Sequence, residues 1–138
     1  MSFTFFTDRN LGHKFPDILR AAGLNVEEHD DHFGPTTPDV EWIAAVASRN
    51  WIAVSRDERI RYKPNERRAV FDAGLGLLLV IGNATHPELA MNFVRTVGSI
   101  MAFLSRHNAP FIAKVYRPSP AEVARNPQAA GRIDLWLP

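Results

Sequence analysis

The chain has 138 residues, with 16 Lys and Arg against 15 Asp and Glu and a formal net charge of +1. This length fits one domain with a substantial core and disfavours two independent domains, and a charge so near zero does not by itself indicate a nucleic-acid-binding protein. The absence of cysteine excludes disulfides, thiolate zinc sites and thiol nucleophiles, so any metal must be bound by oxygen or imidazole. No signal peptide is recognisable, and the longest apolar run, residues 75–81, is too short to span a bilayer. We therefore expect a cytoplasmic protein with no membrane partner.

The predicted elements alternate between strands and helices. Strands are expected at residues 3–7, 24–28, 51–55, 77–81, 111–116 and 133–137. Helices are expected at 14–22, between 37 and 51, at 64–74 and at 85–104, the longest of them, with a short helix beginning near 119 in an otherwise irregular tail. This alternation predicts an α/β fold, a single domain over residues 1–138 with an open, mostly parallel sheet and helices on both faces.

Three carboxylates are expected at the carboxyl edge of this sheet, where the functional sites of such folds lie. Asp8 and Asp57 each follow an apolar strand, and Asp39 begins the helix that leads into the strand before Asp57. Carboxylates this close repel one another and raise at least one pKa unless a hard divalent cation, Mg²⁺ or Mn²⁺, neutralises them. Because such a cation can activate and orient a water towards phosphorus, the predicted chemistry is phosphodiester hydrolysis.

Three segments together resemble the PIN-like domain family, particularly its shortened members related to VapC-type toxins. They are FTDRNL at residues 6–11, PDVEWIAAVA at 38–47 and IAVSRD at 52–57, and the resemblance covers about the first 83 residues. It implies a Mg²⁺-dependent ribonuclease with Asp8, Asp39 and Asp57 as catalytic metal ligands. It also implies an RNA substrate and the role of a toxin restrained by a cognate antitoxin protein. Family members usually carry a further acid on an early helix, where this chain offers only Asp17, and Glu41 is the predicted catalytic replacement.

A basic segment adjoins Asp57. Residues 56–68 contain six Lys and Arg against three Asp and Glu. Positive charge beside a nuclease site attracts and positions RNA phosphates, although a solvated helix face explains the pattern equally well. The predicted RNA-binding residues are Arg9, Arg56, Arg59, Arg61, Lys63, Arg67 and Arg68.

Several alternatives stay open. Asp39 has an ordinary explanation as a helix N-terminal acid, and residues 29–32 (HDDH) are expected to form an exposed loop rather than a metal site. Surplus apolar surface on the helix at 85–104 would suit the antitoxin or a second copy of the chain in a homodimer. The missing early-helix acid favours a degenerate PIN-like scaffold that binds RNA or a protein without cutting. A receiver-like phosphoacceptor, with Asp57 and Lys114, fits less well.

Overall fold

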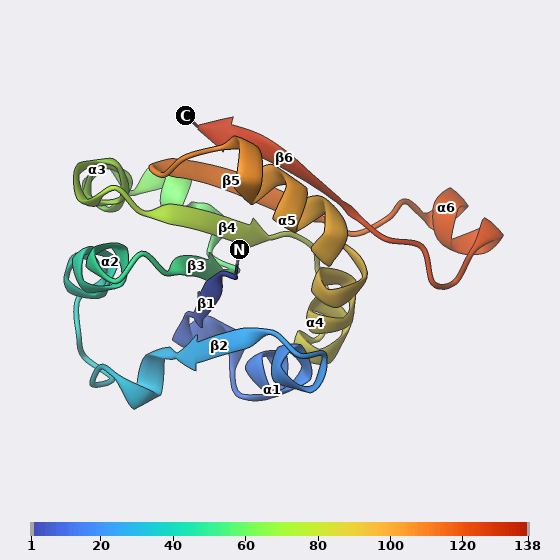
Figure 1. Cartoon of the computed structure of the whole chain (residues 1–138), viewed down its shortest axis with the longest axis horizontal. Coiled ribbons are helices and arrows are strands. Elements are labelled where there is room, and N and C mark those ends of the chain that lie inside the picture. The colour runs from blue at the N-terminus through green and yellow to red at the C-terminus, as the bar shows by residue number, and fades with distance from the viewer. Residues whose placement is uncertain (1, 138) are drawn as a thin grey trace.

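The computed structural model describes residues 2–137, apart from the side chains of Glu58 and Arg61. Within this range it contains a six-stranded sheet in the order β2-β1-β3-β4-β5-β6 (Figure 1). The strands are β1 (Thr4–Thr7), β2 (Asn25–Glu28), β3 (Ile52–Ser55), β4 (Gly76–Val80), β5 (Phe111–Tyr116) and β6 (Arg132–Leu137). All neighbouring strands are parallel except β5 and β6, which are antiparallel. The predicted α/β class with a mostly parallel sheet is confirmed.

Helices follow most strands and cover both faces of the sheet (Figure 1). The α-helices are α1 (Lys14–Ala21), α2 (Asp39–Ser48), α3 (Pro64–Ala73), α4 (His86–Arg95), α5 (Val97–Arg106) and α6 (Pro120–Arg125). Three short 3-10 helices in the described part of the chain are η1 (Arg9–Leu11), η2 (His29–Asp31) and η3 (Glu58–Tyr62). Pro64 at the start of α3 and Gly74 after its end, with φ of 76°, fit the predicted helix boundaries. None of the described helices is long and apolar enough to cross a membrane.

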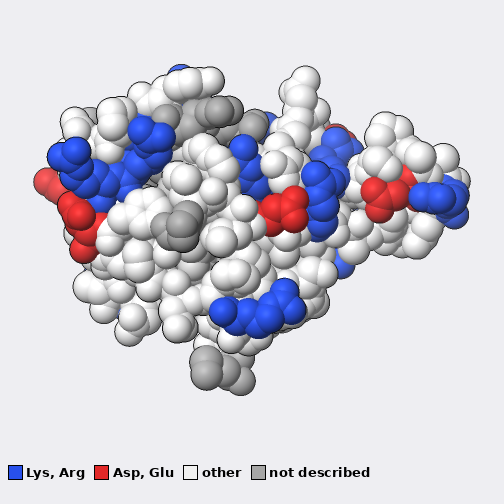
Figure 2. Space-filling model, turned by 90° about the horizontal axis from the view of Figure 1, so that it is seen from above, with Lys and Arg blue, Asp and Glu red and all other residues white. Residues whose placement is uncertain are grey.

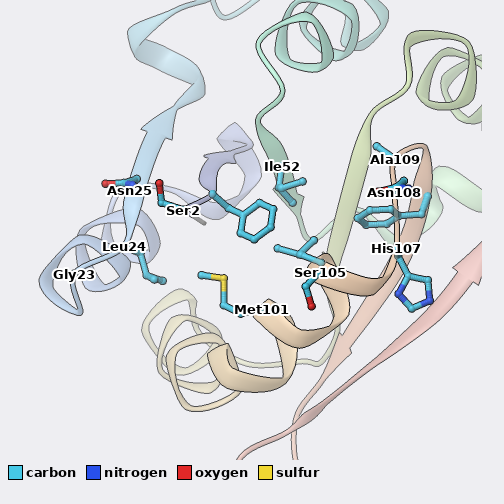
Figure 3. Close-up of a pocket in the computed structure, with 13 residues that line it drawn as sticks. Ser2, Gly23, Leu24, Asn25, Ile52, Met101, Ser105, His107, Asn108 and Ala109 are labelled. Carbon is cyan, nitrogen blue, oxygen red and sulfur yellow. The ribbon is translucent and has the colours of Figure 1, made fainter.

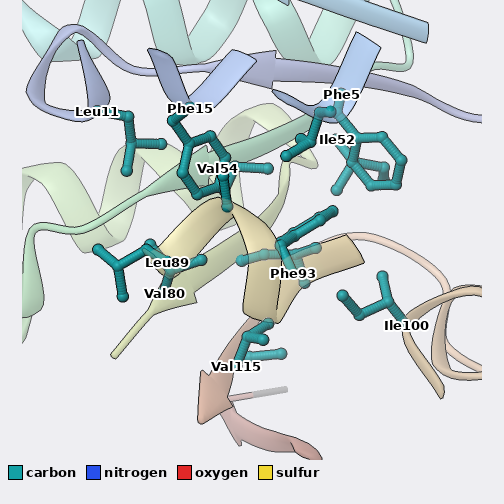
Figure 4. Packing of buried hydrophobic residues seen from close by; sticks show 14 of the residues in the cluster. Phe5, Leu11, Phe15, Ile52, Val54, Val80, Leu89, Phe93, Ile100 and Val115 are labelled. Carbon is teal, nitrogen blue, oxygen red and sulfur yellow. The ribbon is translucent and has the colours of Figure 1, made fainter. Parts of the chain in front are cut away.

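Alternating strand residues build a separate apolar core on each face of the sheet. Phe5 packs on the α1, α4 and α5 side, where its ring meets that of Phe93 edge to face at a centroid distance of 5.4 Å (Figure 4). Phe6, its neighbour in sequence, packs on the α2 and α3 side against Trp42. Because both faces are covered, β3 and β4 are fully buried, which explains their continuous apolar sequences.

The prediction of one long helix over residues 85–104 is wrong, because Thr96 separates α4 from α5. The Thr96 hydroxyl donates to the carbonyl of Asn92 at 2.7 Å and accepts the backbone N–H of Gly131 at 3.0 Å. Asn92 in turn donates its side-chain amide to the carbonyl of Tyr116. The helix break therefore anchors the returning C-terminal segment, a long-range contact that apolar spacing along the helix does not encode.

The C-terminal segment is also more ordered than the predicted irregular tail. Ser119 and Glu122 form a reciprocal capping box at the start of α6, in which each side chain accepts the backbone N–H of the other residue. No residue of α6 is buried, and the helix projects from the body as an arm (Figure 1). The chain then returns to the sheet as β6, close to the predicted terminal strand.

Candidate active site

Four carboxylates converge at the carboxyl edge of the sheet. Asp8 follows β1, Asp57 follows β3, Asp39 opens α2 and Glu66 lies in the first turn of α3. All four line one small cavity together with Ser55, the last residue of β3. The structure therefore brings the three predicted metal ligands together, and it adds a fourth acid that sequence reasoning placed only in the basic segment.

The cavity is small, with a volume of about 20 Å³. A cavity of about 10–15 Å³ on this measure accommodates one water molecule, so this one has room for a single occupant of that size. Apolar side chains complete its lining, namely Trp42, Ile43, Ile60, Leu77 and Leu79. Such walls lower the local polarity and strengthen electrostatic interactions among the carboxylates.

Both carboxylate oxygens of Asp8 accept hydrogen bonds. Oδ1 accepts the backbone N–H of Arg9 at 2.7 Å, and Oδ2 accepts the hydroxyl of Ser55 at 3.0 Å. Burial raises the pKa of Asp8 above its usual value, and the nearby charge of Asp39 adds to this effect, so that together they outweigh the two hydrogen bonds. A cation in the cavity would relieve this cost by stabilising the ionised form.

Ser55 connects the ends of β1 and β3. Its hydroxyl donates to Asp8 and accepts the side-chain amide of Asn10 at 3.0 Å and the backbone N–H of Asp57 at 3.2 Å. The Ser55 residue is only 4 % exposed. This one hydroxyl therefore fixes the position of Asp8 relative to the loop that carries Asp57.

Asp57 is surrounded by positive charge. Its Oδ1 accepts the backbone N–H of Arg59 at 3.0 Å and the guanidinium Nε at 3.3 Å, and its Oδ2 accepts the ammonium of Lys63 at 3.0 Å. Burial alone would raise the pKa of Asp57, but these hydrogen bonds outweigh it and lower the pKa below its usual value. At Asp57 the hydrogen bonds therefore stabilise the ionised form by more than burial destabilises it, whereas at Asp8 burial has the larger effect.

Glu66 is the fourth acid that lines the cavity. Glu66 and Asp39 line the same cavity, and burial together with the negative charge of Asp39 raises the pKa of Glu66. Glu41 is exposed and does not line the cavity, and Asp17 lies on α1 beside Arg20. The sequence signal for Glu66 was its position in the first turn of a helix opened by Pro64, at the same sheet edge as Asp57.

The predicted RNA-binding residues divide into two groups. Those in the first group contact protein atoms: Arg9 donates to the carbonyl of Pro35, Arg56 donates to the carbonyl of Ala84, and Arg59 and Lys63 bind Asp57. The second group, half-buried Arg67 and exposed Arg68, lies on α3. Figure 2 shows basic and acidic side chains gathered at the end of the molecule where α3 lies. The side chain of Arg61 falls outside the described atoms.

The prediction of an exposed loop at residues 29–32 is wrong for His29. Residues 29–31 form η2, and His29 is only 3 % exposed, with its ring against Phe6 and Phe33. Its Nδ1 has no hydrogen-bond partner in the described structure and lies 3.6 Å from Oδ1 of Asp30. His29 therefore helps to close the core beneath the site.

A much larger cavity lies at the opposite edge of the sheet, where β1, β2, β3 and β5 begin (Figure 3). Its volume is about 630 Å³, and its walls include Leu24, Ile52, Met101 and Phe111. No Asp or Glu lines it. Size therefore does not identify the site, because the smaller cavity at the carboxyl edge has the acidic groups and the perturbed pKa values that mark catalytic sites.

The carboxylates suit a hard divalent cation by chemistry, because Mg²⁺ and Mn²⁺ prefer oxygen ligands. Within the described residues, however, no three His, Cys, Asp or Glu side chains are arranged to hold a metal ion. The hydrogen bonds described above account for this, since the oxygens of Asp8 and Asp57 face protein donors instead of a common point. The ligand types therefore suit a divalent cation, and the carboxylate side chains would have to rotate in order to coordinate it.

Comparison with known families agrees with this architecture. A family model described as PIN like domain matches residues 3–81, more than half of the chain. The chain belongs to the PIN-like domain family. Its PIN-like region contains all four carboxylates of the cavity, and PIN domains are generally nucleases, so the fold is of nuclease type. No curated protein and no solved structure matches the chain, and the relation to VapC-type toxins stays a prediction.

Proposed function

We propose that the chain is a metal-dependent endoribonuclease that hydrolyses RNA phosphodiester bonds with Mg²⁺ or Mn²⁺. The observation that carries this proposal is the convergence of Asp8, Asp39, Asp57 and Glu66 on one cavity at the carboxyl edge of the sheet. The four residues come from four separate parts of the chain, so local sequence alone does not explain their meeting. A helix N-terminal role would account for Asp39 and Glu66 separately, but not for their position beside Asp8 and Asp57.

In this proposal the four carboxylates hold the cation, which when bound supplies Lewis acidity and an activated water. Ser55 keeps Asp8 in place through its hydroxyl, and the apolar wall formed by Trp42 and Leu79 limits the access of bulk water. Arg67, which follows Glu66 on α3, and Arg68 provide positive charge near the cavity for the RNA backbone. The cellular role that we propose is that of a toxin inhibited by a cognate antitoxin, which rests on the resemblance to VapC-type toxins.

The test is cleavage of a mixed pool of tRNA and mRNA by purified protein, with Mg²⁺, with Mn²⁺ and with EDTA. The wild type is compared with Asp8→Asn, Asp57→Asn and Glu66→Gln, and with Glu41→Gln as the matched control. Metal-dependent fragments that disappear in the first three variants and persist in the control support the proposal. Equal cleavage by all five proteins would reveal a contaminating nuclease and refute it.

A second candidate is a PIN-like scaffold that binds RNA without cutting. It is favoured by the absence, among the described side chains, of a group already arranged to hold a metal ion. The same assay separates the two functions, because a scaffold retards RNA in a gel but produces no fragments with either metal.

For the toxin role, induced expression of the wild type should stop cell growth, and induced expression of Asp57→Asn should not.

A further inference from the structure

Lys63 already supplies a positive charge to two of the four carboxylates. Its ammonium Nζ lies 3.0 Å from Oδ2 of Asp57 and 3.6 Å from Oε2 of Glu66. Both acceptors line the small cavity, and their side chains are only 19 % and 23 % exposed. Lys63 is therefore placed as a bridge between the loop after β3 and the first turn of α3.

The backbone around Lys63 fixes this position. The residue follows η3 and precedes α3, and its N–H donates to the carbonyl of Ile60 at 3.1 Å. Its carbonyl accepts the N–H of Glu66 and that of Arg67, both at 3.1 Å. The ammonium thus extends from an ordered junction, in contrast to the exposed ion pairs of a helix surface, which contribute little.

A divalent cation and this ammonium would compete for the same oxygen. When Oδ2 of Asp57 binds a metal, an ammonium at 3.0 Å from that oxygen lies within a few ångströms of a second positive charge. Like charges at such a separation repel strongly where apolar walls exclude water. One of the two cations has to leave, and the lysine has a flexible side chain that is 35 % exposed and can turn to solvent.

We propose that Lys63 is a tethered counterion of the carboxylate cluster, which a divalent cation displaces when it binds, so that Lys63 sets the metal affinity of the site. This inference rests on the proposed metal-dependent function and deepens it. In the absence of metal, Lys63 compensates part of the negative charge and keeps the cluster folded. In the presence of metal, the same charge lowers the affinity, and the site loads only where the divalent cation is concentrated enough to compete.

The first test measures metal affinity directly, by electron paramagnetic resonance with Mn²⁺ and by calorimetry with Mg²⁺. Lys63→Gln should bind both ions more tightly than the wild type, by about tenfold, because the divalent cation no longer has to displace an ammonium whose contact with Asp57 is partly screened by solvent. Lys63→Arg keeps the charge and should retain wild-type affinity. Lys14→Gln removes the same charge from the exposed start of α1 and is the matched control.

The second test uses the wild type, so it does not depend on whether a variant folds. The chain contains three lysines, Lys14, Lys63 and Lys114, so their ammonium signals can be assigned by nitrogen NMR with single substitutions. Addition of Mg²⁺ should shift the Lys63 signal towards that of a solvent-exposed ammonium and leave Lys14 unchanged.

The outcomes separate this inference from the proposed function. Equal or weaker binding by Lys63→Gln, or a Lys63 signal that does not move while Mg²⁺ binds, overturns the inference and leaves the nuclease proposal standing. Failure of the wild type and of Lys63→Gln to bind either ion overturns both. Displacement is supported if Lys63→Gln is the one variant that binds the ions more tightly than the wild type and if Mg²⁺ shifts the Lys63 signal.

Discussion

The hydroxyl of Ser55 should make an unusually large contribution for a single oxygen atom. Ser55→Ala removes a hydrogen bond to the Asp8 carboxylate and the acceptor for both the Asn10 amide and the Asp57 N–H. A hydrogen bond to a charged group contributes about 1.5–3 kcal/mol and a neutral one about 1 kcal/mol, and such contributions are not fully additive within one network. We expect the free energy of unfolding to fall by about 2–4 kcal/mol, or roughly 6–12 °C in melting temperature for a domain of this size.

The loss should also depend on pH, because its largest part is the bond to ionised Asp8. The Ser55 hydroxyl lowers the pKa of Asp8 against the opposing effect of burial. Removal of the Ser55 hydroxyl should therefore raise the pKa of Asp8 further. As the pH falls through the pKa of Asp8, the carboxylate becomes protonated, and the stability difference between wild type and Ser55→Ala should decrease.

Urea unfolding of metal-free protein at several pH values measures the stability difference, and carbon NMR of the carboxyl groups measures the pKa of Asp8. Ser48→Ala is the control, because its hydroxyl bonds to the carbonyl of Ala45, three residues earlier on the exposed side of α2. If Ser55→Ala were as stable as Ser48→Ala, or if its deficit were the same at every pH, Ser55 would not be the connection between Asp8 and Asp57 that we describe.

The remaining predictions concern charge, RNA and backbone packing. Asp8→Asn should stabilise the metal-free protein at neutral pH, because a carboxyl group whose pKa is raised in the folded state loses stability as the pH rises above its usual value. Asp57→Asn should instead destabilise the metal-free protein at neutral pH, and this loss of stability should disappear as the pH falls through the lowered pKa of Asp57. The urea midpoint, measured at several pH values, tests both variants. Arg67→Gln should weaken RNA binding and reduce the slope of log affinity against log salt by about 0.7, as measured by fluorescence anisotropy. Gly131→Ala should reduce the free energy of unfolding by about 1–3 kcal/mol, because a Cβ at this position collides with the carbonyl oxygen of Tyr116.

Control variants and contrary outcomes can be stated for these predictions. Gly98→Ala adds a methyl group to α5 where no atom lies within 4 Å of it, so it should be neutral or stabilising by up to about 1 kcal/mol. Arg125→Gln removes a charge from the projecting arm and should leave the RNA salt slope unchanged. Similar pH profiles for Asp8→Asn and Asp57→Asn would contradict the opposite environments assigned to the two acids, and a harmless Gly131→Ala would contradict the close approach of the chain there.

The sequence predicted the sheet and three of the carboxylates because their signals are local. Apolar strands that end in an acid, such as the one before Asp8, need only the rule that parallel strands end at one edge. Asp57 follows the same rule, and the helix that starts at Asp39 was predicted from a proline and an acid in its first turn. These features depend on neighbouring residues alone, and they are the ones that the structure reproduces.

The features that sequence reasoning missed depend on partners far away in the chain. Glu66 was counted as one acid in a basic segment, because its distance from Asp39 is set by the packing of α3 on α2. Lys63 was expected to face RNA, whereas it faces Asp57. Thr96 interrupts a helix that its apolar spacing predicts to continue, and its hydroxyl accepts the N–H of Gly131, which lies far away in the chain. Tertiary contacts of this kind leave no periodic pattern in the sequence.

The positions of the four carboxylates along the chain limit how far the protein can be shortened. The last of them, Glu66, precedes β4, and the family match ends at residue 81, just after that strand. A fragment ending there would keep every carboxylate of the cavity. It would also expose Leu78 and Val80, which pack in a core with residues of α4 and β5. The segment that matches the family therefore contains the whole carboxylate cluster but lacks part of the core that keeps it folded, and a shortened version of this chain would have to retain the sheet through β5 and the helices between.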